Sequence, residues 1–308
     1  MSPLGLGLAA LGRPGYIDIG HAADLGADRS VEAMRAHAHA VLDAAYELGI
    51  RYFDAARSYG RAEEFLASWL DEHSPADVTV GSKWGYVYTA DWRADAEVHE
   101  VKDHSLENLK RQYAESRELL GDRLALYQVH SATLDGGVLE DERVLDELRR
   151  LRAEGLVVGL TLSGPRQADA LRRALELDVF ETVQATWNLL ETSVGEALVD
   201  AHRAGWGVIA KEAVANGRLT ARGDAAEREP LRSLAAHREA SPDQLALAAA
   251  LSQPFADVVL SGATTATQLK SNAGAVGLAL PWQELDALEG MAEPAERYWE
   301  ERSELPWT

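Results

Sequence analysis

Four side chains that can donate, accept or stabilise a proton each follow a short apolar run in this sequence. Asp54 ends one run, and Tyr59 comes five residues later in a loop of small residues. Lys83 and His130 end the next two such runs. If these runs are parallel strands of a barrel, their carboxyl ends converge on one face, where active sites collect. The spacing therefore predicts that the four groups meet in one site.

Such a site has the parts needed to protonate an oxygen that gains negative charge. Tyrosine, with an unperturbed pKa of about 10, is a weak acid near neutral pH until a cation stabilises its phenolate. Lys83 can supply that cation and lower the pKa of Tyr59, and Asp54 can keep Lys83 charged. A neutral His130 can orient a substrate oxygen through a hydrogen bond. Because no side chain donates hydride, carbonyl reduction here requires a nicotinamide cofactor.

The elements that must position these groups alternate between strand and helix. We expect strands at residues 4–11, 50–53, 78–82, 124–129, 157–162, 180–185, 207–210 and 258–260. Helices are expected at residues 30–48, 61–73, 102–120, 140–153, 165–176, 193–204, 242–252 and 265–276. Ser30 and Gly49 are typical residues for the start and the end of the first of these helices. Eight strand–helix pairs in strict alternation predict an α/β fold, a (β/α)8 TIM barrel.

The length of 308 residues suits one such barrel, so we expect a single domain over residues 1–308. The polar stretch at residues 211–240 predicts a long loop after the seventh strand. Residues 281–308 follow the eighth pair as a C-terminal extension, with a helix expected near residues 282–291.

Composition disfavours several classes of partner. The formal net charge of −20 argues against binding to nucleic acid or to anionic membrane surfaces. The chain has no cysteine, so disulfides and thiolate catalysis are excluded. No apolar run reaches the roughly 18 residues of a membrane span, and the first residues lack the pattern of a signal peptide. We therefore expect a cytoplasmic protein without nucleic-acid or membrane partners. The sequence does not define its oligomeric state.

Taken together, these residues resemble the aldo-keto reductase superfamily. Asp54, Tyr59, Lys83 and His130 match its catalytic tetrad in identity, order and strand-end placement. The similarity continues in the segments at the ends of the fifth, sixth and eighth strands, so it covers nearly the whole chain. It implies an NAD(P)H-dependent oxidoreductase that reduces an aldehyde or ketone, with hydride from the nicotinamide C4 and a proton from Tyr59.

The resemblance also implies which residues contact the cofactor. They lie after the fifth to eighth strands: Ser163, Gly164, Gln184, Lys211, Glu212, Ala213, Asn216, Gly217, Leu219, Gly262, Thr264, Gln268 and Asn272. Ser163 and Gln184 would hold the nicotinamide carboxamide, and residues 212–219 would form a loop over the pyrophosphate. NADP(H) is favoured by family habit and NAD(H) is the alternative. Discrimination between them is expected to be weak, because residues 261–265 contain no cation and Gln268 stands where many relatives have arginine.

Lys211 departs from the family pattern. Many relatives have a tyrosine here that stacks on the nicotinamide, and Trp187 and Trp206 are candidates for a replacement face. Alternatively, Lys211 and Glu212 form a solvated surface pair of little energetic weight. Gly164 is a second departure, because many relatives have an asparagine there, and one expected hydrogen bond is lost.

Aromatic residues crowd the segment after the third strand. We expect Trp84 and Tyr86, together with Trp187, to line an apolar substrate pocket. For Trp92 in the same segment, a packing role is the alternative. The resemblance further implies that the extension 281–308 lies over or beside the barrel mouth.

Other functions are open at this point. The same hydride step can run in reverse on a sugar or alcohol, or can act on a C=N bond, whose iminium form needs less help from an acid. A nucleotide-binding regulatory subunit is a non-enzymatic alternative, which the intact tetrad argues against. His37 and His39 look like a metal pair, but side chains two residues apart on a helix do not share a face. No metal site is expected.

Overall fold

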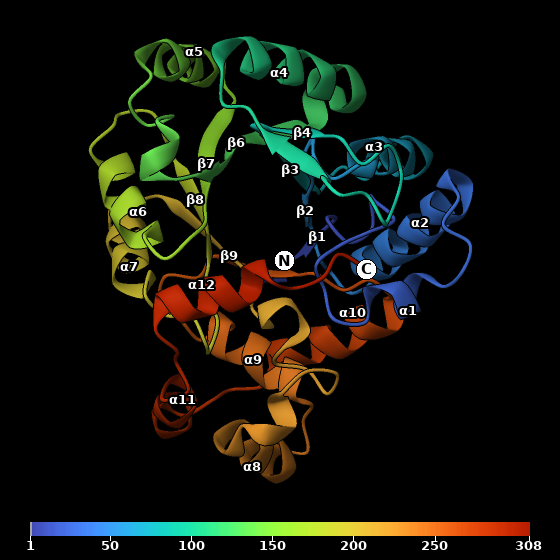
Figure 1. Cartoon of the computed structure of the whole chain (residues 1–308), viewed down its shortest axis with the longest axis vertical. Coiled ribbons are helices and arrows are strands. Elements are labelled where there is room, and N and C mark those ends of the chain that lie inside the picture. Colours follow the sequence, from blue (N-terminus) through green and yellow to red (C-terminus); the bar gives the residue numbers. More distant parts are fainter. Residues whose placement is uncertain (1) are drawn as a thin grey trace.

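The computed structural model describes residues 2–308 and places eight strands in a closed barrel in which every pair of neighbouring strands is parallel (Figure 1). The barrel strands are β1 (Leu4–Gly7), β2 (Tyr52–Asp54), β3 (Thr79–Trp84), β6 (Leu124–Ala132), β7 (Val157–Leu162), β8 (Thr182–Thr186), β9 (Gly207–Lys211) and β10 (Val258–Ser261). The predicted (β/α)8 barrel is confirmed. The first strand is shorter than predicted because the chain turns at Leu8, whose carbonyl accepts the Leu11 N–H at 3.0 Å.

Helices surround the barrel in Figure 1. They are α1 (His21–Leu25), α2 (Val31–Glu47), α3 (Ala62–His73), α4 (Leu106–Leu120), α5 (Glu142–Ala153), α6 (Gln167–Leu175), α7 (Gly195–Arg203), α8 (Glu229–Arg238), α9 (Pro242–Leu251), α10 (Ala266–Ala273), α11 (Trp282–Glu289) and α12 (Ala295–Ser303). Side-chain caps set several of the starts, as predicted from the sequence. The Ser30 hydroxyl, for example, accepts the Ala33 N–H at 3.3 Å.

Four parts of the chain differ from the prediction, and the first is α1, which forms in a segment expected to be a loop. Residues expected to begin a helix at 102 instead end a hairpin of β4 (Tyr86–Tyr88) and β5 (Glu100–Lys102), and α4 starts only after its cap Ser105. The region expected as a polar loop after the seventh strand contains α8. The last helix, α12, lies in the extension and was not predicted.

The C-terminal extension packs along one edge of the barrel opening (Figure 1). The backbones of Thr308 and Tyr16 exchange two hydrogen bonds, of 3.1 and 3.2 Å. The Trp307 ring stacks on His99 with centroids 3.9 Å apart and an angle of 6° between the planes. These contacts join the extension to the β1–α1 loop and to the segment between β4 and β5.

Small residues inside the barrel make room for the base of the site. The Tyr52 side chain points inward, and its hydroxyl donates to Asp54 Oδ1 at 3.0 Å. A Cβ added at Gly5 would lie 2.8 Å from the Tyr52 ring, and one at Gly81 would lie 2.4 Å from the Tyr52 hydroxyl. Glycine at both positions therefore leaves room for the Tyr52 side chain, whose hydroxyl donates to Asp54.

Candidate active site

The four residues singled out from the sequence meet at the carboxyl end of the barrel. Lys83, on β3, is 1% exposed, and its ammonium donates to three oxygens at once. These are the Asp54 carboxylate, the Ala55 carbonyl at 2.9 Å and the Tyr59 hydroxyl at 3.2 Å. Since an ammonium has three hydrogens, its donor capacity is fully used. The tyrosine oxygen is thus linked through one cation to a buried carboxylate.

Asp54 is held on its other side by amides. Gln184, on β8, donates its side-chain N–H to Asp54 Oδ1 at 2.9 Å, and Gln128 does so at 3.4 Å. The Gln184 contact uses the amide nitrogen, so the amide oxygen can accept a hydrogen bond from a ligand. The carboxylate is therefore fixed by side chains of four strands, β2, β3, β6 and β8.

His130 faces the same space because it lies two residues after Gln128 on β6, and side chains alternate along a strand. Beyond it the strand is irregular. The register of β6 against β7 shifts between Val129 and Ala132, and Ser131 adopts a left-handed conformation with φ of 56°. The Thr161 hydroxyl accepts the Ser131 N–H at 2.7 Å and stabilises this bulge. The rings of His130 and Tyr59 meet edge to face, with centroids 5.4 Å apart. Bulges are common next to active sites, and this one lies at Ser131, which lines the cavity beside His130.

The ionisation of the site departs in one respect from the prediction. Burial, followed by the Asp54 charge, raises the pKa of Tyr59 well above 10, whereas the sequence argument expected Lys83 to lower it. The expectation failed because burial disfavours a phenolate more than one already paired ammonium favours it. Burial, with Lys83 next, lowers the pKa of His130 well below 6.5, so the imidazole is neutral, as predicted.

A cavity of about 330 Å³ opens beside Tyr59 and His130. Its wall includes charged and aromatic residues that the sequence did not indicate as site residues: Arg13, Tyr16, Glu100 and Arg302. Trp307, from the C-terminal extension, also lines it. Arg13 is 3% exposed, donates to Glu100 at 2.9 Å and lies 5.2 Å from the Tyr59 ring centre. The family resemblance implied that the C-terminal extension closes the mouth. No other pattern marked these residues, because none lies at the carboxyl end of a barrel strand.

The predicted apolar substrate pocket is only partly correct. Tyr86 lines the cavity, but Trp84 and Trp187 do not. Side chains alternate along a strand. Since Lys83 faces the barrel interior, Trp84 faces outward, is fully buried and meets the His104 ring at 5.6 Å. Trp187 is 2% exposed and packs on Phe255. The wall around Tyr86 is mixed, because Arg13, Glu100 and Ser131 also form part of it.

Most of the residues expected to contact a cofactor border this cavity or its neighbour. Ser163, Gln184, Lys211, Glu212, Ala213, Asn216 and Gly262 line the first cavity. A second cavity of about 190 Å³ shares Asp18, Val214 and Gly262 with the first and is also lined by Gly217, Gln268 and Asn272. Gly164, Leu219 and Thr264 line neither cavity, and Leu219 is fully buried in the core. A direct contact through the Leu219 side chain is therefore ruled out by its burial.

The two adjoining cavities fit an extended anionic cofactor. Between them the chain runs through left-handed conformations at Ala215, Asn216 and Gly217, with φ of 51°, 53° and 91°. A Cβ added at Gly262 would meet no atom within 4 Å, so a ligand can approach the backbone there. Among residues 2–308, the Oδ1 atom of Asn216, which lines the first cavity, is one of the buried polar atoms without a hydrogen-bond partner. Such orphaned atoms indicate a missing ligand or ordered water.

One acidic residue forms hydrogen bonds with the polar side chains of the second cavity. Asp24, on α1, accepts two hydrogen bonds from Arg222, at 2.6 and 2.7 Å, and one from Gln268 Nε2 at 2.7 Å. The oxygen of Gln268 accepts the N–H groups of Thr264 and Thr265 at the start of α10. Gln268 and these backbone groups are therefore already paired, and Arg222 is the cation that the sequence argument missed.

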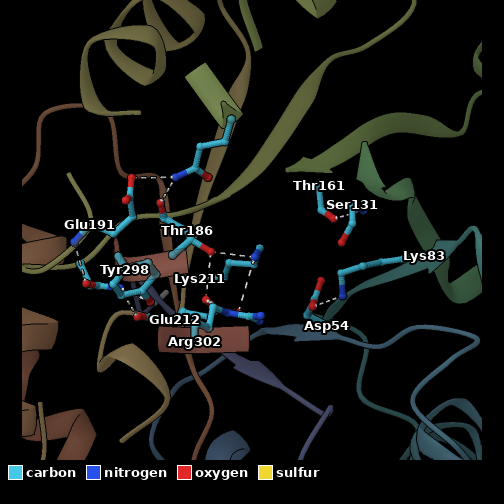
Figure 2. A network of polar contacts seen from close by, with 12 residues as sticks. Asp54, Lys83, Ser131, Thr161, Thr186, Glu191, Lys211, Glu212, Tyr298 and Arg302 are labelled. Carbon is cyan, nitrogen blue, oxygen red and sulfur yellow. Dashed lines mark hydrogen bonds and ion pairs between the residues drawn. The ribbon is translucent and has the colours of Figure 1, made fainter. Parts of the chain in front are cut away.

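Lys211 and Glu212 form a buried network rather than a solvated surface pair (Figure 2). Their side chains are 16% and 10% exposed. Lys211 donates to Thr186 Oγ1 at 2.8 Å, and Glu212 accepts two hydrogen bonds from Arg302 of α12. Burial alone would raise the pKa of Glu212, but Arg302 and Lys211 lower it to about 2. The alternative of a solvated pair was wrong because the extension covers these groups.

His37 and His39 take no part in a metal cluster. Their Nε2 atoms contact the Thr264 carbonyl at 2.6 Å and the Ser68 hydroxyl at 2.8 Å. In the part of the chain that the structure describes, no three histidine or acidic side chains are grouped to hold a metal ion. Among residues 2–308, no helix combines the length and apolar character that crossing a membrane requires.

A parallel barrel with a buried tyrosine–lysine–aspartate cluster, a neutral histidine and adjoining cavities defines a class of nicotinamide-dependent oxidoreductases. The family model described as "Aldo/keto reductase family" matches residues 3–293. The chain belongs to this family and is an NAD(P)-dependent oxidoreductase that acts on small carbonyl compounds.

Individual relatives are distant. The chain is 30% identical over 173 residues to D-threo-aldose 1-dehydrogenase from a Pseudomonas species, which covers 50% of this chain and 52% of that enzyme. It is 26% identical over 287 residues to an aldo-keto reductase of Strobilurus tenacellus, covering 83% of this chain and 81% of the relative. An aldo-keto reductase from Bacillus halodurans, solved in its holo form, superposes with a TM-score of 0.72 at 23% identity, covering 96% of this chain and 95% of that one. That superposition supports the fold alone.

Proposed function

We propose that this enzyme reduces small polar carbonyl compounds with Tyr59 as the proton donor. The observation that carries the proposal is the Lys83 ammonium, which donates to the Asp54 carboxylate and, at 3.2 Å, to the Tyr59 hydroxyl inside a cavity that His130 also lines. When bound, the reduced nicotinamide supplies the hydride. Ser163 and Gln184 would hold its carboxamide, since both line that cavity.

Residues of this chain supply the proton that the substrate oxygen receives. The neutral His130 orients the substrate oxygen, and Tyr59 gives its proton as negative charge develops there. An alkoxide is a stronger base than a phenolate, so this transfer is favourable even from a tyrosine whose pKa is raised. Lys83 then stabilises the phenolate that forms, and Asp54 keeps the Lys83 ammonium in place.

The second cavity bears on the choice between NADP(H) and NAD(H). NADP(H) is favoured by the family resemblance, with NAD(H) as the alternative. Arg222 is the cation best suited to bind a 2′-phosphate, but it is already paired with the carboxylate of Asp24. This pairing supports weak discrimination between the two cofactors.

Oxidation of a sugar or another alcohol is a second candidate. The cavity wall holds Arg13, Glu100, Ser131 and Thr161, whose polar groups suit a hydroxylated substrate. Two relatives with partial matches, D-threo-aldose 1-dehydrogenase and pyridoxal 4-dehydrogenase, are named for oxidation. Reduction of a C=N bond uses the same site.

Replacement of Tyr59 by phenylalanine tests the proposal. We expect kcat for aldehydes and ketones to fall by about 10² to 10⁴, the usual contribution of a general acid, with little change in the Kd for the cofactor. Tyr46→Phe removes a hydroxyl that contacts Asp77 on the surface and should keep full activity. Rates with NADPH and NADH are measured on aldehydes, ketones, cyclic imines and, in reverse, alcohols. A Tyr59→Phe enzyme as fast as its parent on carbonyls would overturn the assignment, whereas a smaller loss on imines alone would identify C=N as the substrate bond.

A further inference from the structure

Lys211 is a buried cation in the cavity that the mechanism above does not use. It is the last residue of β9 and lines the cavity together with Tyr59 and Gln184. Figure 2 shows it on one side of the space and the Asp54–Lys83 pair on the other. Because Gln184 and Ser163 also line this cavity and lie on or just after neighbouring strands, a nicotinamide held by them shares the cavity with the Lys211 ammonium.

The ammonium is held in a fixed position. It donates to Thr186 Oγ1 at 2.8 Å, and the same hydroxyl donates to Glu212 Oε2 at 3.1 Å. Lys211 Nζ lies 3.7 Å from Glu212 Oε1 and 5.9 Å from the centre of the Trp299 ring. With its side chain 16% exposed, the group has little access to water that would screen its charge.

The local charges do not cancel. Glu212 accepts hydrogen bonds from both Nε and Nη2 of Arg302, so one carboxylate serves two cations. Across the cavity, Asp54 and Lys83 neutralise each other, and His130 is uncharged because burial lowers its pKa. In the same cavity Arg13 pairs with Glu100 at 2.9 Å, and burial raises the pKa of Asp18, in the β1–α1 loop, to about 7. Apart from Asp18, Lys211 and the charged groups that face it therefore carry a balance of one positive charge.

This charge acts differently on the two states of a nicotinamide, because the oxidised ring is a cation and the reduced ring is neutral. We propose that Lys211 makes this site bind the reduced cofactor in preference to the oxidised one, and so sets the ratio of their two affinities. The inference rests on the proposed function, since it requires a nicotinamide in this cavity. Neighbouring charges commonly shift ionisation equilibria of buried groups by one unit or more, so the ratio should change about tenfold when the charge is lost.

The proposal also predicts a pH dependence. Burial lowers the pKa of Lys211 to about 8, against the opposing effect of Glu212. Below this value the ammonium is present and disfavours the oxidised ring. As the pH rises through about 8, the charge is lost and binding of the oxidised form should strengthen, whereas binding of the reduced form should not change.

Binding measurements on the full-length protein test the proposal without turnover. The Kd values for NADP+ and NADPH are measured from pH 6.5 to 9.5 by quenching of the intrinsic fluorescence of the eight tryptophans. The ratio of the two values cancels every effect on the adenine half of the cofactor. Lys211→Met should lower the ratio of Kd for NADP+ to Kd for NADPH about tenfold at pH 7 and abolish the change in this ratio near pH 8, and Lys211→Arg should retain the parent ratio at pH 7.

Each result is decisive. An unchanged ratio in Lys211→Met, or equal weakening of both forms, would overturn the proposal. If Lys211→Met does not fold, Lys211→Arg is compared with the parent, because arginine keeps its charge up to pH 9.5 while Asp18 titrates alike in both proteins. A ratio that falls between pH 7.5 and 9.5 in the parent but not in Lys211→Arg supports the proposal, and parallel curves overturn it. If the parent binds neither form, nor NAD+ or NADH, the proposed function itself fails.

Discussion

Replacing Asp54 by asparagine should show how much the buried Lys83–Asp54 pair contributes to the free energy of unfolding. The two side chains are 0% and 1% exposed, and asparagine keeps the shape while it removes the charge. Removing one partner of a buried ion pair costs about 3 to 5 kcal/mol in folding free energy, because the remaining charge is left unpaired.

The pKa of lysine limits this loss. Lys83 in the variant can remain charged or release its proton. Release from a lysine with an unfolded-state pKa of about 10.4 costs about 4.6 kcal/mol at pH 7, since each pKa unit corresponds to about 1.36 kcal/mol. We therefore expect the free energy of unfolding to fall by about 3 to 5 kcal/mol at pH 7.

The sign of the pH effect follows from proton counting. Burial lowers the pKa of Lys83 in the parent, where Asp54 opposes the shift, and loss of Asp54 removes that opposition. The folded variant therefore binds fewer protons than the folded parent. The stability difference between parent and variant should narrow as the pH rises from 7 towards 10, by at most about 1.4 kcal/mol per pH unit.

Denaturant unfolding of the parent and the variant at pH 7, 8 and 9 measures both effects. Asp77→Asn is the matched control, because Asp77 pairs with Arg51 at the surface with 56% of its side chain exposed. Exposed pairs contribute about 0 to 1 kcal/mol, and arginine does not titrate in this range, so the control should lose little stability at any pH. A variant as stable as the parent at pH 7, or a deficit that grows with pH, would refute the reasoning.

Two further substitutions test the surroundings of the site. A Cβ at Gly12 would lie 2.2 Å from the Tyr59 carbonyl oxygen, so Gly12→Ala should displace the Tyr59 loop, lower kcat about tenfold or more and cost about 1 to 3 kcal/mol of stability. Gly277→Ala, where a Cβ meets open space, should have neither effect, and a Gly12→Ala enzyme with parental kcat would contradict the packing argument. Asp24→Asn releases Arg222, so the ratio of the Kd for NADH to that for NADPH should rise about three- to tenfold; an unchanged ratio would show that Arg222 does not contact the 2′-phosphate.

The barrel and the core of the site were predictable because they follow from local patterns. Each barrel strand is a short apolar run, and its alternation with helices selects a parallel barrel. Chemical groups at the ends of such strands must converge, so Asp54, Lys83 and His130 were found by position alone. The helix starts were readable where a side chain such as Ser30 caps the backbone.

The rest of the cavity wall has no such signal. Arg13 and Tyr16 come from the β1–α1 loop, Glu100 from the hairpin, and Arg302 and Trp307 from the C-terminal extension. They are close in space because loops and the extension pack over the barrel mouth, and long-range packing of this kind leaves no periodicity in the chain. Trp84 shows the opposite error, since a residue next to a catalytic lysine in sequence points to the other side of the strand.

The sequence by itself determined the architecture, the family and the convergence of Asp54, Tyr59, Lys83 and His130 at the barrel mouth. Hydrophobic periodicity and the residues at strand ends are local properties of the chain. Only the tertiary structure decided the pKa shifts of Tyr59 and Lys211. Burial reverses the expected shift in the pKa of Tyr59 and lowers that of Lys211 to about 8. The reason is physical: the free energy of a charge depends on the water removed from it, and that is set by every segment that covers it.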